Sequence, residues 1–337
     1  MNMRRIAWFL AAGAAAASPA LAWDAHGHRT ITLLAMDGFA AQTSGLPDWL
    51  TNSDARARVA YQASEPDRYR STKMVYMSHE NSPEHYIDIE DLEQFGLTLS
   101  TVPPLRYQYV AVMAVARHEH PENVKPHNPK LDPSGEQEWP GFVPHAIMEH
   151  YVKLSSAFRT VRTLEQINDP KRAQELEMAK ANAFAEMGFL SHFVGDAAQP
   201  LHTTAHHHGW VGDNPKGYTT DRGFHAYIDG TILSIHHLDH DSLKDECKFD
   251  AKVDQGDPWN DVIAYIQRSH DMVEPLYLLK KTGELEKDEG KKFMSERLTD
   301  AAGMLAAMYQ AAWASGTPND KDKPDFVKYD VPDPRVK

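Results

Sequence analysis

A histidine and an aspartate lie four residues apart in an otherwise apolar segment, and this pair restricts how the chain can fold. His192 and Asp196 are flanked by Leu190, Phe193 and Val194. On a helix, residues four apart share one face about one turn from each other. Such a pair is often a surface salt bridge, but on a buried face it requires a ligand or a partner. The segment therefore predicts a buried helix with a polar pair that could hold a metal ion.

Further metal-ligand residue types follow and precede this pair. Pro200 breaks the helix, so His202 lies on a turn beyond its end, where it could reach a second metal. His225 and Asp229 repeat the four-residue spacing in an apolar setting. Other oxygen and imidazole donors occur in three segments of the N-terminal half, at 23–28, 65–70 and 84–88.

The cysteine and histidine counts favour metal sites over disulfides. Cys247 is the only cysteine, so no intramolecular disulfide can form. The chain has 19 histidines in 337 residues, and neutral imidazole is the commonest metal ligand. Since metal binding adds folding free energy, we expect bound metal to stabilise the fold.

The first 22 residues predict a secretory signal peptide. Arg4 and Arg5 precede an apolar run over 6–17, and Ala20 and Ala22 form an A-x-A cleavage pattern. The run is shorter than the roughly 20 residues that a membrane-spanning helix needs. We therefore expect cleavage before Trp23, a secreted or periplasmic protein, and no membrane span. No obligate protein partner is evident.

The remaining chain predicts an all-α, mostly helical single domain. Apolar residues from Ile147 to Val161 are spaced 4, 3, 4, 3, and a second stripe runs from Met294 to Ala312. Other helices are expected at 28–39, 178–197, 224–235 and 259–280, with long loops at 119–144 and 203–222. The domain spans 23–316, and 317–337 is a polar tail. Because 48 acidic residues outnumber 35 basic ones, a duplex-DNA binder is disfavoured.

Together, and in this order, the donors resemble those of a known enzyme family. The chain is similar to the trinuclear-zinc single-strand nucleases, the type I nucleases of the S-one/P-one kind, whose fold is shared more distantly with bacterial zinc-dependent phospholipase C. The resemblance spans most of the chain from Trp23 onward. Its most specific segment is 192–202, which matches the family pattern H-F-x-G-D-x-x-Q-P-x-H.

The resemblance implies three zinc ions per chain. The first would be held by Trp23, through its free amine and carbonyl, with His28 and a bridging Asp196. The other two sets follow from the same likeness. The second zinc would take Asp67, His85, His192 and Asp196, and the third His202, His225 and Asp229 with water.

The resemblance also implies roles in catalysis and substrate binding. Asp67 would orient the attacking water, and Arg70 would contact phosphate. Tyr86 matches the base-stacking aromatic, and Asp88 the acceptor of the base edge. The expected substrates are single-stranded RNA and DNA, cut to 5'-phosphorylated products, and nucleotide 3'-phosphates as a secondary substrate.

Simpler interpretations compete at several positions. Tyr86 could be an ordinary core or rim aromatic, and Asp88 could only cap a helix or form a salt bridge. The family match favours His28 over His26 and His85 over His79. The loop histidines at 206–208 suggest solvation or adventitious metal binding.

Two alternatives to a nuclease remain. A phospholipase C would use the same three zincs, but its last ligand is typically glutamate where this chain has Asp229. The other alternative is an exported zinc-binding protein without turnover, which Asp67 and Arg70 argue against. The chain also departs from the nuclease pattern at Gly223 and Ile228, where the family has asparagine and tryptophan, so the third zinc site is expected to differ in shape.

Overall fold

The chain folds into α-helices joined by loops and short 3-10 turns. The computed structural model describes residues 23–130 and 132–330. Within these residues, β-type pairing is limited to one isolated bridge between Ile87 and Gly141. The prediction of a mostly helical all-α single domain is therefore confirmed. The predicted signal peptide, 1–22, and the end of the predicted tail, 331–337, lie outside the described residues.

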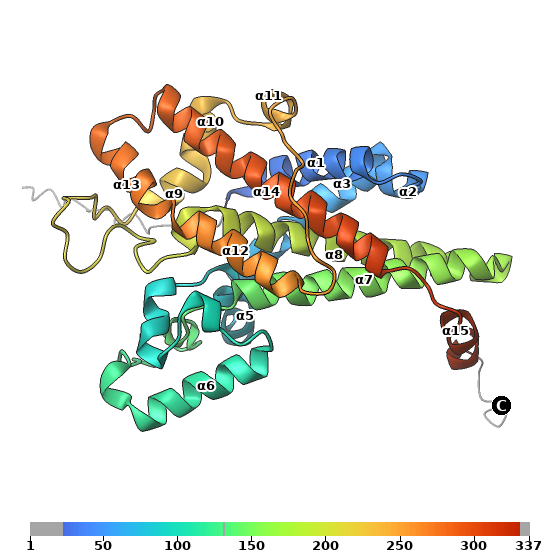
Figure 1. Ribbon diagram of the computed structural model, residues 1–337, viewed down its shortest axis with the longest axis horizontal. Coiled ribbons are helices and arrows are strands. Elements are labelled where there is room, and N and C mark those ends of the chain that lie inside the picture. Colours follow the sequence, from blue (N-terminus) through green and yellow to red (C-terminus); the bar gives the residue numbers. More distant parts are fainter. Residues whose placement is uncertain (1–22, 131, 331–337) are drawn as a thin grey trace, which may run out of the picture.

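Two long helices form the centre of the molecule. α7 (Val143–Ile167) and α8 (Ala173–Ala198) run side by side along its longest axis (Figure 1). α14 (Asp288–Ser315) packs on both, and α1 (Ala25–Gln42) packs on α14. The apolar stripes predicted on α7 and α14 are buried in these contacts. Burial of one apolar stripe per helix is the main favourable term for such a bundle.

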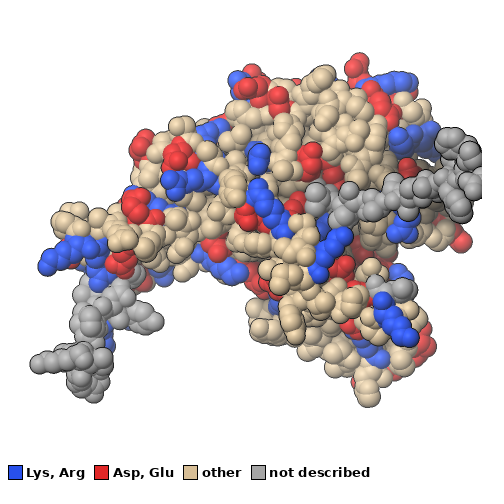
Figure 2. Space-filling view, turned by 180° about the vertical axis from the view of Figure 1, so that it is seen from behind, with Lys and Arg blue, Asp and Glu red and all other residues tan. Residues whose placement is uncertain are grey.

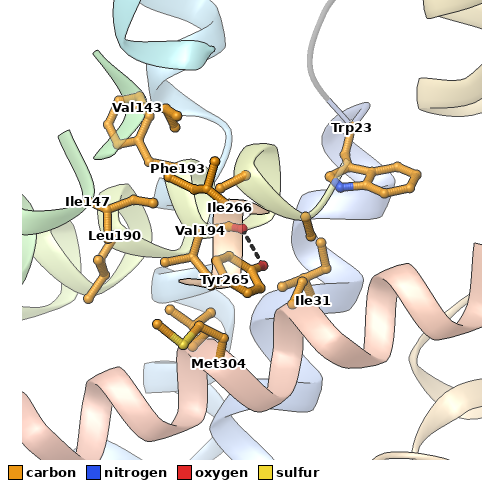
Figure 3. Packing of buried hydrophobic residues seen from close by; sticks show 14 of the residues in the cluster. Trp23, Ile31, Val143, Ile147, Leu190, Phe193, Val194, Tyr265, Ile266 and Met304 are labelled. Carbon is orange, nitrogen blue, oxygen red and sulfur yellow. Dashed lines mark hydrogen bonds between the residues drawn. The ribbon is translucent and has the colours of Figure 1, made fainter. Parts of the chain in front are cut away.

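Two hydrogen bonds attach other segments to the C-terminal part of α8. The Tyr265 hydroxyl, on α12 (Pro258–His270), donates to the carbonyl oxygen of Val194 at 2.8 Å (Figure 3). The indole Nε1 of Trp23 donates to the carbonyl oxygen of Gly195, also at 2.8 Å. Both side chains are fully buried. The backbone just before Asp196 is therefore held from two sides.

The predicted helix at 259–280 is divided into α12 and α13 (Val273–Thr282). Pro275 explains the division. In a continuous helix its ring would clash with the carbonyl of residue 271, whereas a proline is tolerated in the first turn of a new helix. The predicted helix at 224–235 is also irregular. It consists of α9 (Phe224–Ala226), the π-helical turn η8 (Tyr227–Thr231) and α10 (Ile232–His236).

The N-terminal half contains short helices beyond those expected. Several are too short or too exposed to show a clear apolar period. They are α2 (Asp48–Thr51), α3 (Ser53–Gln62), α4 (Glu65–Ser71), α5 (Val75–Asn81) and α6 (Arg106–Glu119), with the 3-10 turns η1 (Ser82–His85), η2 (Ile89–Phe95) and η3 (Leu99–Thr101). α6 lies on a lobe beside the α7–α8 pair (Figure 1).

The expected loops and tail contain short elements of their own. The segment 119–144 includes η4 (Pro121–Asn123) and η5 (Glu136–Glu138), and η6 (Pro170–Arg172) precedes α8. η7 (Pro200–His202) follows α8, and α11 (His240–Leu243) follows α10. In the predicted tail, α15 (Asp322–Asp330) packs against α7, where the Lys323 ammonium donates to the Gln166 carbonyl at 3.3 Å. No helix among the described residues combines the length and apolar character needed to cross a membrane.

Candidate metal centre

Eight of the predicted ligand side chains come together in three groups of three. All eight are buried, and within each group the donor atoms lie within 4.8 Å of one another, so each group could hold a metal ion. The helices that supply them are far apart in the sequence. The groups are His28, Asp67 and His192; His85, His192 and Asp196; and His202, His225 and Asp229.

Asp196 belongs to the second group and also faces the first. Its Oδ2 is 3.0 Å from Nδ1 of His85 and 3.3 Å from Nε2 of His192. Its Oδ1 is 3.4 Å from Nε2 of His28. The two carboxylate oxygens thus face different histidines, an arrangement suited to a carboxylate that bridges two ions. The predicted bridging role of Asp196 is compatible with this geometry.

Backbone carbonyls orient two of the imidazoles. Nδ1 of His192 lies 2.8 Å from the carbonyl oxygen of Ala63, at the end of α3, and Nδ1 of His202 lies 2.6 Å from that of His85. Because a carbonyl only accepts, each Nδ1 carries the proton and each Nε2 lone pair is directed at the cluster. Metal-binding histidines usually donate their second N–H in this way.

In the third group, the donor atoms lie close to the spacing of zinc ligands. Nε2 of His202 and Nε2 of His225 are 2.9 Å apart, and Oδ2 of Asp229 is 3.4 Å from Nε2 of His225. Ligands of a tetrahedral zinc, about 2.0–2.1 Å from the ion, lie roughly 3.3 Å from one another. The π-helical turn η8 carries Asp229, and such turns are frequent at functional sites.

Gln199 supports the third group and was not singled out from the sequence. Its side chain is fully buried, and its amide Nε2 donates to Oδ1 of Asp229 at 2.8 Å. Its carbonyl Oε1 accepts from the backbone N–H of Leu201 at 2.6 Å. Gln199 therefore holds the Asp229 carboxylate so that Oδ2 faces His225. The available sequence signal was its place in the matched pattern H-F-x-G-D-x-x-Q-P-x-H, where it is the Q.

Several buried polar atoms of the cluster have no hydrogen-bond partner. Unpaired buried polar groups are costly and rare in folded proteins. Such atoms also occur elsewhere among the described residues, but six lie on predicted ligands, and a bound cation would account for those that face it. The atoms are Nδ1 and Nε2 of His28, Oδ1 of Asp67, Oδ1 of Asp196, Nδ1 of His225 and Oδ2 of Asp229.

Burial favours the metal-binding form of the histidines. It lowers the pKa of His28 and of His225 well below the usual 6.5, and that of His202 to about 3. These imidazoles are therefore neutral at pH 7. Burial also raises the pKa of Asp196 well above its ordinary value and that of Asp67 to about 6. A bound cation would favour the charged form of both carboxylates.

The second group contains three of the four ligands predicted for the second zinc, and the first group differs from its predicted set. His28 lies with Asp67 and His192, rather than only with Asp196. Only Nε2 of His192 faces the cluster, so this residue can bind one ion at a time. The Trp23 indole is placed by its bond to Gly195, and the ligand role of its amine stays a prediction.

The predicted substrate residues are buried or half-buried. Arg70 is half-buried, and its positive charge opposes the effect of burial on the pKa of Asp196. The half-buried Tyr86 donates its hydroxyl to the carbonyl of Glu136 at 2.9 Å. Asp88 is buried, with Oδ1 3.4 Å from Nδ1 of His207.

The structure separates the competing histidines. His26 is exposed and its Nε2 faces the carbonyl of Leu238 at 3.0 Å, whereas His79 faces the carbonyl of Ser134 at 2.6 Å. Neither belongs to the three groups.

Two of the loop histidines are half-buried and lie near the third metal group. The ring centroid of His208 is 5.4 Å from that of His225, and the centroid of His207 is 6.2 Å from it. His206 instead stacks on Trp210 at 3.8 Å. The path of the 203–222 loop decides these positions, and the sequence has no periodic signal for it.

In comparisons with known proteins, no family model and no curated protein matches this chain.

Proposed function

We propose that this protein is an exported zinc-dependent phosphodiesterase that cuts single-stranded RNA and DNA to 5'-phosphorylated products and also removes nucleotide 3'-phosphates. One observation carries the proposal: three adjacent, buried His/Asp groups, with Asp196 in one and facing another, and the charge of Arg70 beside them.

The donor set supports zinc as the metal. Five imidazoles and three carboxylates contribute, whereas magnesium and calcium sites consist mainly of oxygen ligands. Zinc, when bound, polarises a phosphoryl oxygen and lowers the pKa of a water to near neutrality.

The chain's own residues would bind and orient the reactants. The planar guanidinium of Arg70 suits two oxygens of one phosphate. Asp67 has a buried Oδ1 without a partner, which can accept a proton from the attacking water or bind metal. Gln199 keeps Asp229 oriented through its amide.

The net negative charge of the chain supports a substrate that is bound through few phosphate contacts. The chain has 48 acidic and 35 basic residues, and Figure 2 shows both kinds interspersed over the face drawn. Tight binding to a duplex relies on many phosphate contacts. An unpaired base could instead stack on Tyr86 and donate to Asp88, as single strands do on aromatic side chains.

The test is hydrolysis by the purified protein from Trp23 onward, with zinc counted in the same sample. Single-stranded RNA, single-stranded DNA, duplex DNA and phosphatidylcholine are compared. We expect cleavage of both single strands to 5'-nucleotides, with about three zincs per chain. Cleavage of the lipid alone would make the protein a phospholipase C. Zinc without any hydrolysis would make it a binding protein.

A pair of arginine variants separates catalysis from metal storage. Arg70→Ala should reduce kcat/KM for single-stranded DNA by about 100-fold, with zinc content unchanged, because a charged phosphate contact is lost. Arg68→Ala is the matched control on the same helix, since Arg68 pairs with Glu65 and lies over the ring of Tyr61. Equal activity of the two variants would contradict the role of Arg70.

A further inference from the structure

Backbone hydrogen bonds join the segment that carries Asp88 to the segment that follows His202. The N–H of Ile87 donates to the carbonyl of His202 at 2.9 Å, and the N–H of Ile89 to that of Thr203 at 3.4 Å. The Glu90 carboxylate accepts from the Thr204 hydroxyl at 2.6 Å and from the next backbone N–H at 2.9 Å. The third metal group and the predicted base pocket are therefore held together.

His207 lies where these two regions meet. Its ring centroid is 6.2 Å from that of His225 in the third metal group and 6.5 Å from that of Tyr86. Its Nδ1 is 3.4 Å from Oδ1 of Asp88. The imidazole thus lies near both the third metal group and the two predicted base-binding residues.

The orientation of the imidazole assigns its proton. Nδ1 faces the carbonyl oxygen of Thr204 at 3.1 Å as well as the Asp88 carboxylate. Because a carbonyl oxygen only accepts, Nδ1 carries the hydrogen and donates. Oδ1 of Asp88 is buried and accepts no hydrogen bond in the structure, and the Nδ1–H of His207 lies 3.4 Å from it, so a small turn of the ring away from Thr204 lets this N–H orient the carboxylate.

We propose that His207 is a positioning residue for base specificity, which holds the Asp88 carboxylate toward the nucleobase of a substrate whose phosphate lies at the third metal group. This proposal rests on the proposed nuclease function. Asp88 alone could rotate, and a rotated carboxylate would accept from different base edges. With His207 in place, one orientation of Asp88 is favoured, so one hydrogen-bonding pattern of the base is preferred.

The test compares base selectivity with hydrolysis of a substrate that has no base. The probes are the four dinucleotides that differ only in the base 5' to the cleaved bond, and bis(4-nitrophenyl) phosphate. For His207→Ala we expect the ratio of kcat/KM between the best and worst base to fall at least fivefold, mainly through KM. Hydrolysis of bis(4-nitrophenyl) phosphate and the zinc content should stay within twofold of wild type.

Three further variants distinguish positioning from general damage. His207→Gln retains an N–H that can reach Asp88 and should recover most of the selectivity. Asp88→Asn should lose it, and the double variant His207→Ala with Asp88→Asn should lose no more than the single ones, because both act through one contact. His206→Ala, in the same loop but stacked on Trp210, is the control and should keep the wild-type ratio.

Two results would overturn the proposal while leaving a nuclease. One is an unchanged ratio of kcat/KM between the best and worst base in His207→Ala. The other is an equal loss of kcat/KM on the dinucleotides and on bis(4-nitrophenyl) phosphate, which would mean that His207 supports the metal group. Failure of the wild type to cut any nucleic acid would instead refute the proposed function itself, and this proposal with it.

Discussion

Asp196 faces His28, His85 and His192 from the end of α8, so its replacement tests the metal centre most directly. Asp196→Asn preserves volume but removes a negative charge and the ability to bridge. We expect the variant to lose at least one zinc per chain and its hydrolysis rate to fall more than about 100-fold. Mutation of residues that only orient metal ligands already lowers metal affinity or activity 10–100-fold. Metal analysis and the nuclease assay measure both effects.

The control for this variant is Glu177→Gln, which removes a charge from an exposed position on the same helix. It should retain zinc and activity. Wild-type zinc content in Asp196→Asn would show that Asp196 is not a ligand.

His145, away from the metal groups, predicts a pH dependence of stability. It is buried against Tyr109, with Nε2 2.9 Å from the carbonyl of Pro103. Burial lowers its pKa to about 4, whereas the unfolded value is about 6.5. The folded state thus binds this proton less readily than the unfolded state. Its contribution is complete above about pH 6.5 and is lost as the pH falls toward 4, by at most about 3 kcal/mol.

The measurement is urea unfolding at pH 7 and pH 4.5 for wild type and His145→Gln, which can still donate to Pro103. Wild type should lose more free energy of unfolding on acidification than His145→Gln. An exposed control, His118→Gln, should behave as wild type. An identical change in the free energy of unfolding between pH 7 and pH 4.5 for wild type and His145→Gln would contradict the lowered pKa of His145.

At the level of elements, the contact of α8 with the end of α3 depends on Gly188. A Cβ there would lie 2.8 Å from the backbone carbon of Gln62 and 2.9 Å from the backbone nitrogen of Ala63. Alanine in place of glycine usually stabilises a helix by up to about 1 kcal/mol. Here we expect Gly188→Ala to destabilise the protein by about 1–3 kcal/mol, because α3 and α8 must separate.

The same substitution should weaken zinc binding, since the carbonyl of Ala63 accepts the hydrogen bond that orients His192. Urea unfolding and zinc titration test the two effects. Glu177→Ala, on the exposed side of α8, should leave both unchanged. A more stable Gly188→Ala protein would show that the two helices can adjust at no cost.

At the scale of the whole molecule, the candidate metal groups connect helices from both halves of the chain. Their donors come from α1, α4, η1, α8, η7, α9 and η8. Binding to the folded state alone stabilises it by about 2.7 kcal/mol per site when free metal is 100 times the dissociation constant. Removing the bound metal with a chelator should therefore lower the unfolding midpoint by several degrees.

Circular dichroism during heating measures this midpoint. Added zinc should restore it, and added magnesium should not, because imidazole ligands favour zinc. An unchanged midpoint after complete metal removal would mean that the cluster is stable without ions.

The amino-acid sequence determined the local features. The stripes on α7 and α14, and the shared faces of His192 with Asp196 and of His225 with Asp229, follow from the period of a helix, which operates over a few residues. The buried ligand candidates could be selected in the same way, because a polar pair on an apolar face needs a partner wherever that face packs.

The tertiary structure decided which of these features meet. The sequence did not predict that His28 lies with Asp67, that Gln199 holds Asp229, or that His207 contacts Asp88. Each of these contacts joins residues at least 20 positions apart, or depends on the course of a loop. Helix packing and backbone pairing between distant segments set such distances. Neither produces a periodic pattern of residues that could be detected in the sequence.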